Sequence, residues 1–280
     1  MGNSGSKQWR DPGPDKWTEE TVDNLKENIT KLDAEEGSRT KGNILLCGPN
    51  QSGKSSFLNS VIGIRKNRPV HVTHAGSTAA ADSTLTRTYI RVRGGAVFNN
   101  YRLSDAPGLL EPRGEGLNVE DIVSLVQGKI KQGYVFVDGS PIENENEFFN
   151  SAPTEEDKIH CLVFVFDVNL LETVTGRYQA KIRKIMEQMS LKGIPYAMVL
   201  TKIDLFDTYV RDHVSYIHQS FKVGKAVEDA CKKFGIQERS IFPVINLVKE
   251  IDIKPLANIL HLIAMKNILG YTRDFLDERQ

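Results

Sequence analysis

The sequence predicts an α/β protein with a mostly parallel sheet and helices on both faces. Short, continuously apolar runs such as residues 159–166 have the length and composition of strands that are buried on both sides. These runs alternate with longer segments of helical periodicity, as expected where helices connect parallel strands. Hydrophobic residues make up 40% and charged residues 26% of the chain, which is typical of a globular protein.

The expected elements follow one another from residue 41 onward. The predicted strands are residues 43–47, 86–92, 97–103, 159–166, 195–201 and 240–245. The predicted helices of the same region are residues 54–62, 119–131, 177–191, 212–234 and 256–276. Residues 111–158 break the alternation with one helix, a strand-like run at 134–137 and an acidic loop at 143–157. We interpret this segment as an insertion beside the functional site and not as a separate domain.

Residues 1–37 differ from the main domain, which we place at residues 38–280. A polar arm rich in Gly, Ser, Pro and Asp precedes a predicted helix at residues 18–36. A narrow apolar stripe runs along this helix at spacings of three and four. The stripe consists of Val22, Leu25, Ile29 and Leu32. The favoured interpretation is a helix packed on the main domain, and a helix that binds a partner or a membrane surface is the alternative.

Charge and composition exclude several classes of protein. Lys and Arg total 36 and Asp and Glu total 36, which argues against binding of nucleic acid through bulk positive charge. No apolar run is long enough to cross a bilayer, and the polar start of the chain does not fit a secretory signal peptide. The three cysteines are far apart and are expected to be reduced. We therefore expect a cytoplasmic protein that binds no nucleic acid.

A glycine-rich loop follows the first predicted strand of the main domain. Residues 48–55 fit the pattern G-x-x-x-x-G-K-[ST] at every position, between a strand and a helix. In such loops backbone N–H groups converge on phosphate oxygens, the lysine reaches the β- and γ-phosphates and the serine hydroxyl suits Mg²⁺. The alternative is a glycine-rich turn without a ligand. The predicted phosphate-binding residues are Gly48, Asn50, Gln51, Ser52, Gly53, Lys54, Ser55 and Ser56.

Two further motifs follow predicted strands and indicate which nucleotide is bound. Asp105 is expected to reach Mg²⁺ and the N–H of Gly108 to contact a γ-phosphate. Thr201, Lys202 and Asp204 form the second motif. The carboxylate of Asp204 can accept hydrogen bonds from guanine N1–H and the 2-amino group, whereas adenine would leave it unpaired. The order and spacing of the three motifs predict a P-loop NTPase of the Ras-like G-domain type that binds GTP or GDP with Mg²⁺.

With these motifs in place, the chain resembles the interferon-induced protein 44 family. The similarity runs from about residue 41 to residue 278 and includes the phosphate loop. It also includes residues 105–111, 158–167, 200–204, 241–244 and 274–277. The resemblance implies a Ras-like α/β fold, guanine nucleotide binding and a role in interferon-linked, antiviral innate immunity. Longer members of that family carry an extra N-terminal domain, whereas about forty residues precede the phosphate loop here.

Three positions depart from the usual pattern of a GTPase. Thr201 stands where Asn is commoner, although functional GTPases also use Thr. Residues 245–247 replace the usual Ser-Ala-Lys loop, and Asn246 is expected to substitute for part of it in contacting the base. Leu109 follows the Asp-x-x-Gly motif, at the position where small GTPases carry the Gln that orients water. We therefore expect GTP hydrolysis to be slow or to depend on a partner.

The loop after the first helix of the main domain is expected to supply a threonine hydroxyl to Mg²⁺. Thr78, Thr84 and Thr86 all qualify, and we favour Thr84. Arg65, Arg68 and Arg87 lie in the same region. One of them acting as an arginine finger is the alternative to three ordinary surface arginines.

The start of the chain fits the N-myristoylation pattern, with Gly2 in second position and Ser6 in sixth. One myristoyl chain gives only marginal membrane binding, and the sequence offers no nearby cysteine or polybasic patch as a second signal. A leader of small residues without acylation is the alternative. Acylation would give reversible membrane contact. Nucleotide state or homo-oligomer formation could supply the second signal that stable membrane binding needs.

The sequence leaves two main functions open. The first is a guanine-nucleotide switch of innate immunity, favoured by the intact Lys54, Ser55, Asp105 and Asp204. The second is a non-catalytic G-domain scaffold that acts through protein partners, whose identity the sequence does not reveal. An ATP-dependent enzyme is disfavoured by Asp204.

Overall fold

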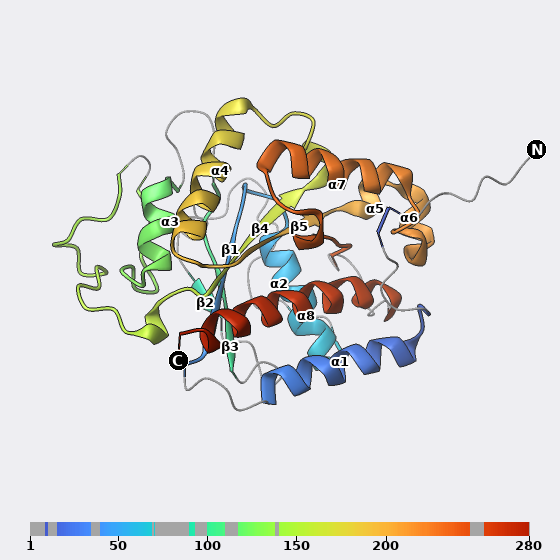
Figure 1. The fold of residues 1–280 in the computed structure, drawn as a ribbon, viewed down its shortest axis with the longest axis horizontal. Helices are drawn as coiled ribbons and strands as arrows, with labels where there is room; N and C mark the ends of the chain where they lie inside the picture. Colours follow the sequence, from blue (N-terminus) through green and yellow to red (C-terminus); the bar gives the residue numbers. More distant parts are fainter. Residues whose placement is uncertain are drawn as a thin grey trace, which may run out of the picture.

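A sheet with helices on both faces forms the centre of the protein (Figure 1). The structure is a computed structural model of the 280-residue chain. The residues that it describes are 9–10, 16–34, 40–68, 70, 90–92, 100–109, 117–137, 140–246 and 255–279.

The described part of the sheet has six strands in the order β2-β3-β1-β4-β5-β6. Their bounds are β1 Gly42–Cys47, β2 Ile90–Val92, β3 Tyr101–Asp105, β4 Cys161–Asp167, β5 Tyr196–Thr201 and β6 Ile241–Pro243. Every pairing is parallel except that between β2 and β3 at one edge. The predicted α/β class with a mostly parallel sheet is therefore confirmed.

The middle strands are buried because both of their faces are covered by helices. Every residue of β1 and β4 is buried, which explains their continuous apolar sequences. Parallel pairing also brings the carboxyl ends of neighbouring strands to one edge of the sheet. In the register, Leu46 pairs with Asp105 and Asp167 pairs with Thr201. This edge carries the motifs that the sequence singles out.

One face of the sheet is covered by α2 (Lys54–Lys66) and α8 (Pro255–Asp277), and α1 (Glu19–Ala34) packs on α8 (Figure 1). The side chains of Val22, Leu25 and Ile29 belong to the hydrophobic core. The preferred interpretation of the N-terminal helix, packing on the main domain, is therefore confirmed.

The other helices lie on the opposite face, where α4 contacts both α3 and α7. These helices are α3 (Val119–Val126), α4 (Gly176–Leu191) and α7 (Phe221–Phe234). Short helices complete the described connections. They are α5 (Ile203–Phe206), α6 (Thr208–Asp212), η2 (Glu155–Asp157), η3 (Val168–Leu170), η4 (Val214–Tyr216) and η5 (Glu238–Ser240).

The prediction of one long helix at residues 212–234 is wrong. The chain leaves helical geometry at His213, with φ −133° and ψ 71°, and α7 begins only after Ser220. The Ser220 hydroxyl accepts a hydrogen bond from the backbone N–H of Val223 and so caps the new helix. The same hydroxyl donates to Asp207 Oδ2 at 2.6 Å. Asp207 is itself the N-cap of α6, so the two hydrogen-bonded caps start two separate helices.

Two elements of the 111–158 segment are also shorter than predicted. The helix expected at residues 119–131 ends at Val126, and Gly128 follows with φ +74°. The strand-like run at 134–137 has isolated bridge residues at Val135 and Val137, of which Val137 pairs with Ser140, and it forms no continuous strand. The expected strand at residues 86–92 is seen only as β2, because residues 71–89 lie outside the described part.

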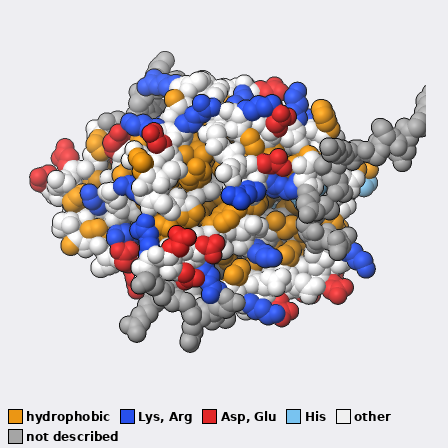
Figure 2. All heavy atoms as spheres, in the orientation of Figure 1, with side chains coloured by type: hydrophobic (Ala, Val, Ile, Leu, Met, Phe, Trp, Pro, Cys, Tyr) orange, Lys and Arg blue, Asp and Glu red, His pale blue; other side chains and the backbone are white. Residues whose placement is uncertain are grey.

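Positive and negative side chains are interspersed on the face of the molecule drawn in Figure 2. That face presents no extended area of one sign, in agreement with the balanced composition. None of the helices in the described ranges combines the length and the apolar content that a bilayer crossing requires.

Candidate functional site

The three predicted motifs meet at the carboxyl edge of the sheet. The glycine-rich loop lies between β1 and α2, and the Asp105–Gly108 segment continues from β3. Thr201 is the last residue of β5, and Asp204 lies in the first turn of α5. Segments that are about 50 and 150 residues apart in the sequence are thereby brought together, as expected for a parallel sheet whose loops carry the site.

The glycine-rich loop turns directly into α2. Gln51 and Gly53 both have positive φ angles, of +59° and +92°, and Gly53 is the N-cap of the helix. A glycine takes up such a left-handed conformation without strain. The backbone N–H groups of the first turn of a 13-residue helix therefore lie at this loop, where an anion is stabilised.

Lys54 reaches back across the loop. Its buried ammonium group donates hydrogen bonds to the carbonyl oxygens of Gly48, at 3.1 Å, and Pro49, at 2.8 Å. Burial lowers the pKa of Lys54, and the nearby carboxylate of Asp105 raises it. A cation held by two carbonyl groups in this way is placed to neutralise a phosphate bound in the loop.

Ser55 and Asp105 form a pair of oxygen ligands beside Lys54. The Ser55 hydroxyl donates to Asp105 Oδ2 at 2.7 Å. Burial raises the pKa of Asp105, whereas Lys54 and the Ser55 hydrogen bond lower it. Among the described residues, Asp105 Oδ1 is a buried atom with no hydrogen-bond partner. A hydroxyl and an unsatisfied carboxylate oxygen are the ligands that Mg²⁺ prefers, so the donor set fits this ion.

No group of three or more His, Cys, Asp or Glu side chains suited to a metal ion gathers anywhere in the described part of the chain. A magnesium ion bound by Ser55 and Asp105 would therefore need further oxygen ligands from water or from a bound phosphate. Such shared coordination is usual for Mg²⁺, which keeps several waters and binds together with phosphates.

The Asp105–Gly108 segment touches the glycine-rich loop. A Cβ atom added to Gly108 would lie 1.8 Å from Asn50 Oδ1, so only glycine fits there. The N–H of Leu109 donates to the carbonyl of Gly48 at 2.9 Å. The side chain of Leu109 is only 1% exposed and belongs to the core. Its apolar side chain is therefore buried next to a backbone that contacts the loop.

Thr201 joins the motif after β5 to the same loop. Its hydroxyl donates to the carbonyl of Ser52 at 2.6 Å, and the side chain is fully buried. The threonine that stands in place of the commoner asparagine thus has a defined structural role. Its short side chain reaches the loop because β5 ends directly beside it.

Lys202 is held by an acidic residue that the sequence analysis did not select. The ammonium of Lys202 forms an ion pair with Asp167 Oδ2 at 2.7 Å, and the Asp167 side chain is 9% exposed. Asp167 is the last residue of β4 and pairs in register with Thr201. Its place at the end of an apolar run is visible in the sequence, but that place does not reveal the pairing with Lys202. Asp204 is partly exposed beside them.

Asn246 also contacts the loop, in a way that differs from the expected base contact. Its amide nitrogen donates to the carbonyl of Gly53 at 3.1 Å. Its Oδ1 atom lies 3.1 Å from Nε2 of His261 on α8, and the Nδ1 atom of the same ring lies 3.2 Å from the carbonyl oxygen of Ala257. Burial lowers the pKa of His261 to about 4, which keeps the ring neutral. The side chain thus links the glycine-rich loop to α8, and periodicity alone did not single out His261.

Several predicted residues cannot be placed in this site. Gly2, Thr84 and the alternatives Thr78 and Thr86 lie outside the described residues, as does Arg87. Arg65 lies in the last turn of α2, at the opposite end of the helix from the glycine-rich loop. Arg68 follows that helix and is exposed. Neither of these two described arginines is placed as an arginine finger at the loop.

Comparison with solved structures agrees with the fold seen in the sheet. Toc33 from Arabidopsis thaliana, solved in complex with Mg²⁺ and GMPPNP, superposes with a TM-score of 0.51 and 15% sequence identity. The match covers 92% of this chain and 97% of that structure. At this identity the similarity concerns the fold alone. The predicted α/β fold, with a mostly parallel sheet and helices on both faces, is thereby supported by a solved structure.

Comparison with known sequences gives more specific relatives, although no family model matches the chain. Human interferon-induced protein 44-like is 30% identical over 239 residues, which cover 84% of this chain and 52% of that protein. Interferon-induced protein 44 from Mus musculus is 32% identical over 236 residues, which cover 84% and 56% of the two chains. The chain spans about half the length of the curated relatives that it matches. It is therefore a homologue of interferon-induced protein 44 and the 44-like protein over 84% of its length.

Proposed function

We propose that this protein binds GTP and GDP with Mg²⁺ at the carboxyl edge of the sheet and acts as a nucleotide-dependent switch. The observation that carries the proposal is the hydrogen bonding of both flanking motifs to the glycine-rich loop. Leu109 N–H bonds to Gly48, and the Thr201 hydroxyl bonds to Ser52. A base bound by the Thr201–Asp204 motif and phosphates bound by the glycine-rich loop would thus be held by segments that are hydrogen-bonded to each other.

The residues of the glycine-rich loop have the chemistry to hold the phosphates. Residues 48–56 bring backbone N–H groups and the start of α2 to one place, and Lys54 adds a buried positive charge. Gly108 lies against Asn50, so its N–H is close to the same loop. We assign the γ-phosphate contact to this N–H, and nucleotide state would be sensed there.

Ser55 and Asp105 would hold the magnesium ion through their oxygens, and Thr84 is the proposed third protein ligand. When bound, this ion supplies positive charge that neutralises the phosphate oxygens. The chain's own part is to orient the ligands. The hydrogen bond from Ser55 to Asp105 fixes both oxygens before any ion arrives.

Asp204 and Lys202 would select guanine. The Asp204 carboxylate can accept from guanine N1–H and the 2-amino group, while the Lys202 stem lies over the base. The ion pair with Asp167 limits where that stem can go. We assign Asn246 a supporting role at the loop and not at the base. Its amide nitrogen already donates to the Gly53 carbonyl, and its Oδ1 atom already faces His261.

Slow or partner-dependent hydrolysis follows from Leu109. Its side chain is apolar and buried, so it cannot hydrogen-bond to an attacking water molecule. The same observation favours the second candidate, a non-catalytic G-domain scaffold that acts by binding other proteins. A homo-oligomer that forms with nucleotide is one way in which either candidate could obtain a missing catalytic group.

Equilibrium binding of fluorescent GTP, GDP and ATP to the purified protein with Mg²⁺ separates the two candidates. Lys54→Ala is the site variant, and Lys184→Ala on the exposed surface of α4 is the matched control. If the protein is a nucleotide switch, wild type should bind guanine nucleotides with micromolar or higher affinity. Lys54→Ala should lose this binding, and Lys184→Ala should retain it. Absence of guanine binding in folded protein would support the scaffold instead.

The biological setting and the domain organisation are proposed on other grounds. The names of the relatives support a place in the interferon-linked innate immune response. Treatment of cells with interferon, followed by measurement of the amount of this protein, would test this.

We further propose a G domain at residues 38–280 with an insertion at 111–158. A cytoplasmic location with weak, reversible membrane contact is proposed from the motif at Gly2. The intact mass of wild type against Gly2→Ala tests acylation, and equal masses after correction for the substitution would refute it.

A further inference from the structure

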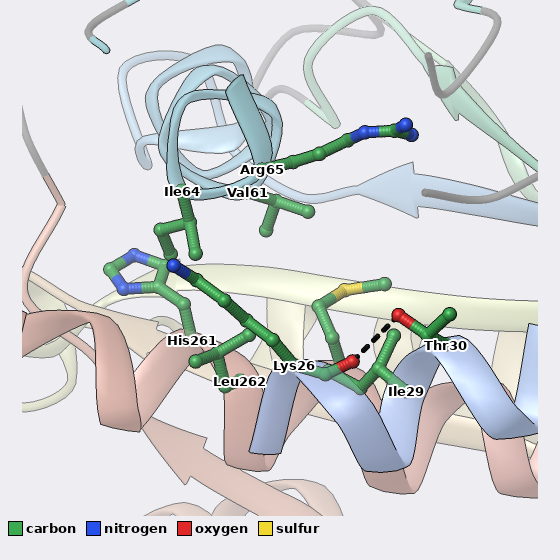
Figure 3. A pocket seen from close by; sticks show the side chains of 9 residues that line it. Lys26, Ile29, Thr30, Val61, Ile64, Arg65, His261 and Leu262 are labelled. Atoms are coloured by element: carbon green, nitrogen blue, oxygen red, sulfur yellow. Dashed lines mark hydrogen bonds between the residues drawn. The ribbon is translucent and has the colours of Figure 1, made fainter. Parts of the chain in front are cut away.

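A pocket of about 220 Å³ lies between α1, α2 and α8, away from the proposed nucleotide site (Figure 3). Its inner wall is apolar and comes from all three helices. Ile29 of α1, Val61 and Ile64 of α2, and Leu262 and Met265 of α8 line it, and each is less than 10% exposed. The wall is therefore closed from solvent on the side of the core.

The pocket opens to solvent at one side and is large enough to hold a small ligand. An engineered apolar cavity of about 150 Å³ stays dry and binds benzene. A pocket of about 220 Å³ with an apolar wall is thus large enough for a ligand somewhat bigger than one aromatic ring.

The charged residues that line the pocket are all basic. None of the residues that line it is acidic, and Lys26 of α1 reaches across it toward Ile64 and His261 (Figure 3). Arg65 points away from the pocket in the same view. The Lys26 side chain is 35% exposed, and its ammonium lies 3.9 Å from the carboxylate of the exposed Asp23, which is a long ionic contact. The ammonium therefore remains able to pair with an anion at the pocket mouth.

We propose that this pocket binds a small amphipathic anion, with an apolar body of about eight carbons and one carboxylate that pairs with Lys26. The apolar wall would cover the body of the ligand and exclude water from it. The charge of Lys26 selects an acid over a neutral molecule of the same length. This site goes beyond the proposed nucleotide binding, and its occupation requires no nucleotide.

Octanoate is a suitable probe, and 1-octanol is its neutral counterpart. Binding is measured by isothermal titration calorimetry on the full chain without nucleotide. For a ligand of this size the dissociation constant is expected to be on the order of 0.1–1 mM. The account predicts saturable binding of octanoate and about threefold weaker binding of octanol.

Three variants locate the site. Val61→Phe places a ring in the pocket and is expected to abolish binding of both probes. Lys26→Gln keeps the apolar wall and is expected to weaken octanoate about threefold without changing octanol. Lys31→Gln removes the same charge from α1 at a position that does not line the pocket, and should leave both affinities unchanged.

The proposal is overturned if octanoate does not saturate wild type at millimolar concentrations, or if octanol binds as tightly as octanoate. It is also overturned if Lys31→Gln weakens octanoate as much as Lys26→Gln does. If Val61→Phe does not fold, Lys26→Gln and Lys31→Gln still test the proposal. Both lysines are solvent-accessible on α1, so their substitution is not expected to prevent folding.

Discussion

The hydroxyl of Thr201 donates to the carbonyl oxygen of Ser52 at 2.6 Å, across about 150 residues of sequence. This bond fastens the end of β5 to the glycine-rich loop after β1. Because both groups are buried, water cannot replace the bond if it is lost. The position of the threonine is thus explained by the fold, whichever nucleotide is bound.

Thr201→Val removes this hydroxyl with little change in side-chain shape. We expect a loss of about 1–2 kcal/mol in the free energy of unfolding, because the Ser52 carbonyl loses its buried donor. Guanine nucleotide affinity should fall as well, since the loop is less firmly held. Urea unfolding and nucleotide titration measure the two effects. Thr201→Ser keeps the hydroxyl and is the control, so equal behaviour of the Val and Ser variants would contradict this role.

Asp167 is expected to act as a positioning residue for Lys202. Asp167→Asn removes the charge that holds the ammonium at 2.7 Å, and we predict about tenfold weaker GTP binding, because the lysine stem is no longer held over the base. Glu228→Gln makes the same charge change in an exposed ion pair with Lys232 and should have no effect.

A double-mutant cycle with Lys202→Gln separates positioning from a general loss of stability. If Asp167 acts through Lys202, its substitution should cost little further affinity once Lys202 is replaced. Fully additive losses in GTP affinity would show that the two residues act independently.

Leu109→Gln tests why hydrolysis is expected to be slow. The substitution restores the residue type that orients water in small GTPases, but it places a polar amide at a position that is only 1% exposed. We predict no gain in GTP turnover and a loss of about 2–4 kcal/mol in unfolding free energy. Phosphate release and chemical denaturation measure these quantities. A clear rise in turnover would show that the side chain at this position does reach the nucleotide.

The buried His261 makes the fold sensitive to acid. Burial lowers its pKa from 6.5 to about 4, so between these values the unfolded chain binds a proton that the folded chain does not. Stability contributed by the neutral ring is therefore present above about pH 6.5 and is lost as the pH falls toward 4. From pH 7 to pH 5 this group should cost about 2 kcal/mol of unfolding free energy.

His261→Gln keeps a polar side chain next to Asn246 but does not titrate. The loss of stability between pH 7 and pH 5, measured by urea unfolding at both values, should be smaller in this variant than in wild type by about 2 kcal/mol. His160, whose pKa burial also lowers to about 4, remains in both proteins and provides the background. Identical pH profiles would show that His261 does not stay neutral in the folded state.

Much of the fold could be predicted because each buried strand is encoded locally. The run at residues 159–166 nearly coincides with β4, and the predicted helix at 177–191 with α4. The single helix predicted at 212–234 failed for a different reason. The interruption depends on a bond between Ser220 and Asp207, which are far enough apart in sequence that periodicity does not report their pairing.

The candidate site could be predicted to a similar extent. Its motif residues carry recognisable spacing, so Lys54, Ser55 and Asp105 could be identified before the structure was known. Asp167 and His261 could not be identified in this way. Asp167 acts through Lys202 and His261 through Asn246, and only the packing of strands and helices brings these pairs together. Side chains that act through another residue leave little local pattern in a sequence.

The identity of the base is the central point of the proposed function, and Asp204→Asn tests it most directly. Xanthine has a carbonyl oxygen where guanine has its 2-amino group. The amide of Asn can donate to that oxygen, whereas the carboxylate of Asp can only accept.

The measurement is competition of GTP and xanthosine triphosphate for the fluorescent-nucleotide site in wild type and in Asp204→Asn. The account predicts that wild type prefers GTP and that the variant shifts the ratio of affinities toward xanthosine triphosphate by about 100-fold or more. An unchanged ratio in a folded variant that still binds nucleotide would contradict guanine recognition by Asp204.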